Sequence, residues 1–275
     1  LNERQRMNSW RLNWVFSQVS DLSNLSKHRQ LLHSSWMFWM AILLKLVPRL
    51  WPFSINLQLR KGGIITVDEF MTLFIYKEIF ADGCYDIPIS LRPDPIIMDI
   101  GANTGLFILR MKQLHPHVRI LGYEPMPSNY RRLKRTIEIN HLPQCEIFMY
   151  GVGGATRKER LYVHPQNLGG HSLYKSVSGG GNDFVEVDIV DIAKELDKLN
   201  GRFCDLLKLD CEGAEYEILK RINRDRAKSI EKIIFEPTPS VYDVNELVGH
   251  LADIGYQVTR FKGLYLAQYQ GESVT

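Results

Sequence analysis

The sequence has few cysteines, and their spacing suits neither a metal site nor a disulfide framework. Only four occur in 275 residues, and none belongs to a CxxC pair. Zinc binding and disulfide stapling are therefore not indicated, and we expect a protein of the reducing cytoplasm. The four cysteines are Cys84, Cys145, Cys204 and Cys211.

Long apolar runs are lacking as well. Residues 36–44 are apolar throughout, but Lys45, Pro48 and Arg49 follow directly. A helix that crosses a membrane needs about 20 apolar residues, so this run is too short. No small-residue cleavage site follows it, which argues against a secretory signal peptide.

A net positive charge is lacking outside the first part of the chain. Residues 1–65 hold nine lysines and arginines against two acidic residues, a net charge of +7, so the rest of the chain carries −4 of the overall +3. A nucleic-acid partner needs a broad basic face, which this mildly acidic remainder does not offer. We therefore predict no nucleic-acid partner.

All five tryptophans also lie within residues 1–65. We predict two parts, a basic, Trp-rich helical extension over 1–60 and a main domain over 61–275. The extension fits an interfacial helix on an anionic surface, with the protein peripheral at the inner membrane face. Alternatively, its tryptophans pack against the main domain or a partner subunit, which leaves a homodimer open.

From residue 94 onward, short β-rich runs alternate with longer amphipathic stretches. This order predicts an α/β fold with a mostly parallel, seven-stranded sheet and an antiparallel C-terminal hairpin that turns at Lys262-Gly263. The predicted strands are Ile96–Ile100, Arg119–Glu124, Cys145–Val152, Glu159–Val163, Phe184–Ile189, Asp205–Asp210, Ile230–Glu236, Tyr256–Phe261 and Leu264–Tyr269. The predicted helices are Thr104–Leu114, Pro127–Asn140, Asp191–Leu199, Ala214–Ile222 and Val241–Ile254.

A glycine-rich turn follows the first of these strands, in the segment Ile96–Gly105. Its GxNxG pattern lacks the GxGxxG spacing of a pyrophosphate cradle, which disfavours an NAD-dependent oxidoreductase. Asp99 at the strand end suits a ligand with a cationic ammonium or sulfonium group. Glu124 ends the next strand, where a carboxylate can accept hydrogen bonds from ribose hydroxyls.

Three ordered motifs at strand ends resemble the FkbM-type methyltransferases, a branch of the class I S-adenosylmethionine-dependent enzymes. They are Asp99-Ile-Gly-Ala-Asn-Thr-Gly105, Tyr123-Glu-Pro-Met-Pro127 and Leu207-Lys-Leu-Asp-Cys-Glu-Gly-Ala-Glu215. The resemblance covers roughly residues 60–240 and implies a Rossmann-like fold, S-adenosylmethionine as cofactor, and a hydroxyl of a sugar, glycan or polyketide-like metabolite as methyl acceptor. The cofactor contacts that we expect are Asp99, Gly101, Asn103, Thr104, Gly105, Glu124, Pro125, Gly151 and Val152, with Glu78 and Tyr85 as a wall over the methionine end.

Carboxylates at the remaining strand ends are the candidates for removing the acceptor proton. Asp210 and Glu212 are the first choices, and Glu236 is a further acidic candidate. His171 lies in a glycine-rich insertion, residues 153–183, and long loops inside compact domains are often functional. Although several carboxylates can attract Mg²⁺, no dedicated ligand spacing is present, so we predict no metal.

One alternative from another functional class is a non-catalytic S-adenosylmethionine-binding or scaffold protein. The intact carboxylates at the strand ends argue against it, because a protein without catalytic activity does not need them.

Overall fold

Of the 275 residues, the computed structural model describes 22–46, 53–87, 92, 94–164, 171–178 and 182–271. The chain divides into two compact units, Leu1–Gly83 and Cys84–Thr275. The sequence placed the boundary earlier, after residue 60. Within the described ranges, no helix is long and apolar enough to cross a membrane.

The N-terminal unit contains the expected helices and, in addition, a short hairpin. The hairpin follows the first two described helices: apolar and polar residues alternate in its strand Ile55–Gln58, the residues of its strand Ile64–Val67 are all β-branched, and Gly62-Gly63 lies between the two. His28 stacks on Phe38, with ring centroids 3.9 Å apart, in the core of this unit. Residues 1–21 and 47–52, which the proposed interfacial helix includes, lie outside the described ranges. The elements are α2 (Leu22–Leu31), α3 (Ser35–Leu46), β1 (Ile55–Gln58), β2 (Ile64–Val67), α4 (Phe70–Tyr76) and the π-helical η1 (Lys77–Ala81).

The larger unit contains the predicted seven-stranded sheet, which confirms the fold class. The four pairings among β10, β9, β3, β4 and β5 are parallel, and the hairpin β11–β12 pairs antiparallel with β10. The strand order is β11 (Tyr256–Phe261), β12 (Leu264–Tyr269), β10 (Lys232–Phe235), β9 (Leu206–Leu209), β3 (Ile96–Ile100), β4 (Arg119–Tyr123) and β5 (Cys145–Phe148).

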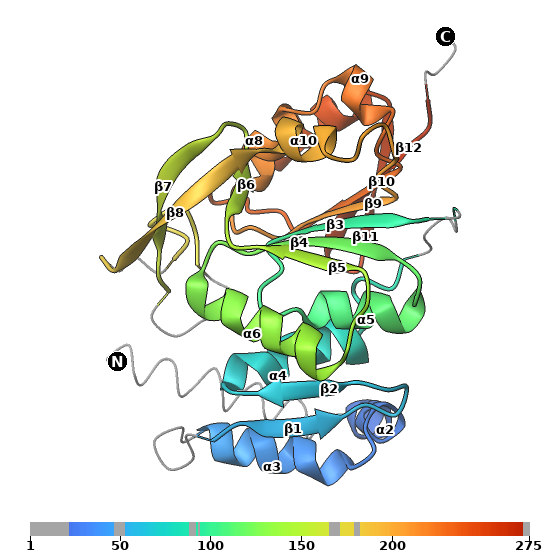
Figure 1. Cartoon of the computed structure of the whole chain (residues 1–275), viewed down its shortest axis with the longest axis vertical. Helices are drawn as coiled ribbons and strands as arrows, with labels where there is room; N and C mark the ends of the chain where they lie inside the picture. Colours follow the sequence, from blue (N-terminus) through green and yellow to red (C-terminus); the bar gives the residue numbers. More distant parts are fainter. Residues whose placement is uncertain are drawn as a thin grey trace. The chain divides into compact units, whose positions relative to one another are not determined.

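Helices cover both faces of this sheet, as a parallel sheet requires. In Figure 1, α5 and α6 lie along one face, and α8 and α10 lie along the other. Pro127 occupies the first turn of α6, where its missing N–H costs nothing, and Asp243 caps α10 by accepting the Asn245 N–H at 2.9 Å. The helices are α5 (Leu106–Leu114), α6 (Pro127–Ile139), α7 (Ile192–Asp197), α8 (Glu215–Lys220), α9 (Arg224–Ala227) and α10 (Val244–Asp253).

A second sheet in this unit has the order β6-β8-β7, formed by β6 (Gly151–Gly153), β8 (Phe184–Asp191) and β7 (Arg157–Tyr162). The predicted continuous strand Cys145–Val152 was therefore wrong. The chain bends at Met149 and Tyr150 and leaves the main sheet, so that Gly151 pairs with Ile189. Without a structure, eight residues of strand-like composition gave no sign of this change of sheet.

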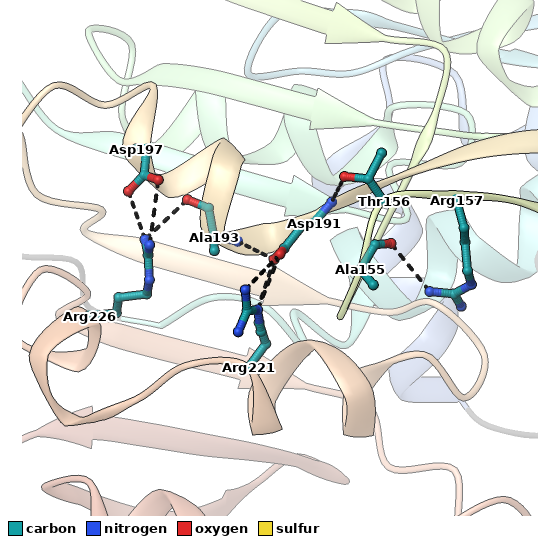
Figure 2. Close-up of polar contacts among 8 residues, drawn as sticks. All are labelled: Ala155, Thr156, Arg157, Asp191, Ala193, Asp197, Arg221 and Arg226. Carbon is teal, nitrogen blue, oxygen red and sulfur yellow. Dashed lines mark hydrogen bonds and ion pairs between the residues drawn. The ribbon is translucent and has the colours of Figure 1, made fainter.

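Asp191 connects the small sheet to the helices of the larger unit (Figure 2). Its side chain caps α7 through the Ala193 N–H at 2.8 Å and accepts a hydrogen bond from Arg221 Nη2 at 3.0 Å, while its own N–H donates to Thr156 Oγ1. Arg226 spans from α9 to Asp197 at 2.8 Å. These contacts anchor the small sheet, and with it the insertion between β7 and β8.

Candidate functional site

The glycine loop after β3 lies against the ends of both neighbouring strands. The Gly101 and Ala102 N–H groups both donate to the Tyr123 carbonyl oxygen at 3.0 Å. Gly101 has φ +80°, and a Cβ placed there would lie 1.9 Å from the Asp210 carbonyl oxygen. Glycine is therefore required here by the backbone of the β9 end.

Asp99 lies at the centre of a buried charge cluster. Its side chain is inaccessible to solvent, and its Oδ1 lies 3.0 Å from the Nζ of Lys208. Burial raises the pKa of Asp99, while the Lys208 ammonium opposes this effect. Asp99 Oδ2 accepts no hydrogen bond from any described residue. One oxygen thus belongs to the ion pair, and the other is available to a donor on a ligand.

Lys208 is a residue that the sequence reasoning missed. Its Nζ donates to the Gly101 carbonyl oxygen at 2.8 Å and lies 3.5 Å from Asp210 Oδ2. Burial lowers its pKa, but the carboxylates of Asp99 and Asp210 raise it by more, so the ammonium form is favoured. A signal was present, since a lysine in the otherwise apolar strand Leu206–Leu209 needs a buried anionic partner.

Glu124 connects the end of β4 to the glycine loop. Its Oε2 accepts the Asn103 N–H at 2.8 Å, and its Oε1 accepts the Met126 N–H at 2.9 Å. Burial raises its pKa to about 7, although both amide hydrogen bonds act in the opposite direction. Each carboxylate oxygen can accept a second hydrogen bond, so a ribose remains a suitable ligand.

Two buried side-chain atoms of the glycine loop lack a partner among the described residues. They are Asn103 Oδ1 and Thr104 Oγ1. Buried polar atoms are nearly always hydrogen-bonded, so atoms without a partner on a ligand-binding edge suggest a missing polar ligand. Asn103 also has φ 49°, a left-handed conformation that is uncommon outside glycine and more readily adopted by asparagine. The loop is thus shaped for a purpose other than packing.

The turn after β9, residues 210–215, presents a second strained residue. Glu212 has φ 52° and is half-buried. Its pKa is raised to about 8, first by burial and then by the negative charges of Asp210 and Glu215. A carboxyl group with a pKa near the working pH is well suited to accept a proton.

The side chains of Asp210 and Glu215, in contrast, are engaged in hydrogen bonds or ion pairs within the protein. Asp210 Oδ2 accepts a hydrogen bond from the Tyr85 hydroxyl at 3.2 Å and lies beside Lys208. Glu215 is fully buried, and its two oxygens accept the Cys211 and Gly213 N–H groups at 2.7 and 2.9 Å. Glu212 is therefore the acidic side chain of this turn that is least engaged in holding the backbone.

The other two catalytic candidates, Glu236 and His171, lie outside the turn after β9. Glu236 is exposed just beyond the end of β10. His171 is half-buried, and its Nδ1 accepts the His164 N–H at 3.1 Å. Burial lowers the pKa of His171 to about 4, which makes it a weak base.

The remaining cofactor candidates lie in different surroundings. Pro125 follows Glu124 directly, and a Cβ on Gly151 would lie 3.5 Å from the Pro125 Cβ, so these two residues are neighbours. Val152 is buried in the main apolar core. Glu78 is exposed in η1 of the N-terminal unit. The contacts of these residues with a cofactor stay predictions.

The ends of β3, β4 and β9 carry four acidic residues, Asp99, Glu124, Asp210 and Glu212, and we call this part of the sheet the anionic edge. Two carboxylates, Asp99 and Asp210, share the single ammonium of Lys208, which leaves net negative charge for a cationic ligand. Glu124 offers acceptors to hydroxyl groups, and Glu212 offers a base. Among the described residues, no group of three histidine, cysteine or acidic side chains is arranged to hold a metal ion.

Known proteins resemble this chain over more than half of its length. The sequence model of the methyltransferase FkbM domain matches residues 99–258, more than half of the chain. Methyltransferase sdnD of Sordaria araneosa is 32% identical over 219 residues, which are 68% of this chain and 83% of that protein. The 31-O-demethyl-FK506 methyltransferase FkbM of Streptomyces tacrolimicus is 26% identical over 225 residues, 71% of this chain and 85% of that protein. Among solved structures, methyltransferase FkbM from Methylobacillus flagellatus has a TM-score of 0.45 at 15% identity and covers 93% of this chain and 60% of its own.

Proposed function

The chain belongs to the FkbM family of methyltransferases, and from this premise we propose that it transfers a methyl group from S-adenosylmethionine to a hydroxyl oxygen of a sugar, glycan or secondary metabolite. The observation that carries the proposal is the anionic edge at the ends of β3, β4 and β9. This edge carries two kinds of group that a methyltransferase needs. Buried polar atoms of Asn103 and Thr104 lack a partner among the described residues, and the carboxyl group of Glu212 has a raised pKa.

The residues of the edge fit this cofactor. Glu124 would accept the ribose hydroxyls, and Asn103 Oδ1 and Thr104 Oγ1 would gain polar partners. The excess negative charge of the Asp99, Lys208 and Asp210 cluster would favour the cationic amino acid end. When bound, S-adenosylmethionine supplies a methyl group on a positively charged sulfur.

The chain's own contribution to the reaction is orientation and proton removal. The turn after β9 would hold the acceptor hydroxyl in line for transfer, since misplacement by 1 Å can cost about 100-fold in rate. The Glu212 carboxylate would accept the hydroxyl proton as the oxygen bonds to the methyl carbon and the bond from that carbon to sulfur breaks, with S-adenosylhomocysteine as the leaving group. Lys208 and Tyr85 would keep Asp210 in place beside it.

Oxygen as the methylated atom is supported by two points. The name of the Streptomyces tacrolimicus relative refers to a 31-O-demethyl compound. A base of raised pKa also suits a hydroxyl acceptor, because the hydroxyl proton must leave as the oxygen is methylated, whereas a free amine carries its own lone pair.

The proposal is tested by calorimetry and by a transfer assay. We expect S-adenosylhomocysteine to bind to the purified chain, and radiolabelled S-adenosylmethionine to label members of a panel of mono- and oligosaccharides and polyketide alcohols. Alkali-stable label on an acceptor whose only polar groups are hydroxyls would indicate an ether and exclude a methyl ester. Binding of NADH in place of S-adenosylhomocysteine, or label confined to nitrogen acceptors, would refute the proposal.

A further inference from the structure

The inserted segment 171–178 is attached to the turn after β9 through one buried hydroxyl. Ser172 is only 1% exposed. Its backbone forms an antiparallel β-bridge with Tyr162 of β7, in which the Tyr162 N–H donates to the Ser172 carbonyl oxygen at 2.8 Å. From this position, Ser172 Oγ lies 2.5 Å from the Glu212 carbonyl oxygen. Residues 40 positions apart in the sequence are thereby joined.

The direction of this hydrogen bond follows from the chemistry of its partners. The Tyr174 N–H donates to Ser172 Oγ at 3.0 Å. A carbonyl oxygen can only accept, so the hydroxyl hydrogen of Ser172 points to Glu212. The hydroxyl therefore accepts one hydrogen bond from its own segment and donates one to the turn.

Glu212 needs such support because its backbone is strained. A non-glycine residue in a sparsely populated backbone conformation persists only where its surroundings hold it there. On either side of Glu212, the N–H groups of Cys211 and Gly213 donate hydrogen bonds to the Glu215 carboxylate. The Glu212 carbonyl itself is held by Ser172, from outside the turn.

A second contact keeps the segment on the turn. A Cβ on Gly213 would lie 2.8 Å from Cδ2 of Tyr174, so the tyrosine ring packs directly on the glycine backbone. Gly213 has φ +115°, which a residue with a side chain rarely adopts. The segment and the turn are thus shaped to fit each other at two adjacent residues, Glu212 and Gly213.

We propose that Ser172 is a positioning residue that holds the peptide of Glu212 in its left-handed conformation and so fixes the Glu212 carboxyl group for proton removal. The role of Glu212 rests on the proposed function. The structural role of Ser172 does not, and the two can fail separately. The charged groups that act on the Glu212 carboxyl are Asp210 and Glu215.

The test follows the titration of Glu212 directly. Carbon-13 NMR of the protein labelled at the glutamate carboxyl carbon, with the resonance assigned by Glu212→Gln, gives the titration midpoint without an acceptor. In Ser172→Ala we expect the midpoint to fall by about one pH unit or more, because a relaxed turn lets water reach the carboxyl group. In Ser172→Cys, which keeps the volume but donates weakly, we expect a shift in the same direction.

Ser178 provides a matched control. It is also fully buried in the segment, but its Oγ donates at 3.1 Å to the carbonyl oxygen of Lys175, within the segment itself, and not to the turn. Ser178→Ala should leave the Glu212 midpoint unchanged. An unchanged midpoint in both Ser172 variants, or an equal shift in Ser178→Ala, would overturn the proposal. If Ser172→Ala does not fold, Ser172→Cys decides.

Calorimetry with S-adenosylhomocysteine on the same proteins separates the two claims. If the unaltered chain does not bind S-adenosylhomocysteine, the proposed function is refuted. The titration of Glu212 would still decide whether Ser172 holds the turn. Binding in all variants, with the midpoint shifted only in the Ser172 variants, is the result that we expect.

Discussion

The Nζ atom of Lys208 lies 3.0 Å from Oδ1 of Asp99, and both side chains are almost completely buried. The pair joins neighbouring parallel strands, β9 and β3, directly beneath the glycine loop. Removing one partner of a buried ion pair leaves the other charge without compensation, which costs more than the intact pair contributes. Lys208 therefore determines both the stability and the charge of this edge.

Replacing Lys208 by methionine should lower the free energy of unfolding by about 3–5 kcal/mol, because the buried Asp99 carboxylate loses its partner. Urea unfolding measures this loss. Lys232→Met is the matched control, since Lys232 is also buried on a central strand but pairs with the more accessible Glu231. The double variant Asp99→Asn/Lys208→Met should recover part of the loss. Equal effects in the two single variants would contradict a special role for this pair.

Gly101→Ala should destabilise the chain more than Gly201→Ala. Both glycines have positive φ, +80° and +78°, so both variants incur a backbone penalty of about 1–2 kcal/mol. Only at Gly101 does the added methyl group meet backbone, the Asp210 carbonyl, whereas nothing lies within 4 Å at Gly201. Denaturation and calorimetry with S-adenosylhomocysteine should show that Gly101→Ala alone also loses affinity. Equal stability in the two variants would show that the loop tolerates the methyl group.

Glu124→Gln should weaken S-adenosylhomocysteine binding by about 1.5–3 kcal/mol, the range for hydrogen bonds to a charged group. Alanine would be a poorer probe, because it would leave both the Asn103 and the Met126 N–H groups without an acceptor, whereas glutamine keeps one acceptor oxygen for the two. Isothermal titration measures the affinity. Glu195→Gln, another buried carboxylate, should leave it unchanged. An affinity that does not change in Glu124→Gln would remove Glu124 from the cofactor site.

Glu124 should also make stability depend on pH. Its pKa is raised by burial from 4.5 to about 7, so the folded chain binds the proton more tightly than the unfolded chain does. The resulting stabilisation is fully present below about pH 4.5 and is lost as the pH rises through about 7. The unaltered chain should therefore lose stability over this window relative to Glu124→Gln. Parallel curves of unfolding free energy against pH would contradict the raised pKa.

Turnover should rise with pH through the titration of Glu212. The carboxylate form is the base, and its pKa of about 8 means that the protonated form dominates at lower pH. We expect the rate to increase with pH to a plateau above about 8, and Glu212→Gln to lower it by about 10²–10⁴-fold and remove the dependence. Steady-state rates on an acceptor from the panel provide the measurement.

Asp210→Asn is the informative comparison, because Asp210 is held by Lys208 and Tyr85. We expect it to weaken cofactor affinity while the rate still rises with pH, with a lower midpoint because the Asp210 charge no longer raises the pKa of Glu212. His171→Ala and Glu236→Gln should retain the pH dependence as well. Full activity in Glu212→Gln together with a large loss in His171→Ala would move the base to the inserted segment.

Much of the main domain could be predicted because local pattern and fold agree there. The closing hairpin was predicted at the bounds observed, since a Lys262-Gly263 turn separates two alternating strands. The strand ends that carry Asp99, Glu124 and Asp210 were also predicted, because parallel strands bring their carboxyl ends to the same edge. The domain boundary and the second sheet were not predicted, because both depend on contacts between segments that are distant in the sequence.

By itself, the sequence determined the order of strands and helices and the family motifs at the strand ends, because each of these is written in residues that lie next to one another. Only the tertiary structure decided which charges meet. Lys208 is 109 residues from Asp99, and Ser172 is 40 residues from Glu212. A buried charge or a strained peptide is tolerated only where distant elements provide its partner, and no local pattern records that partner.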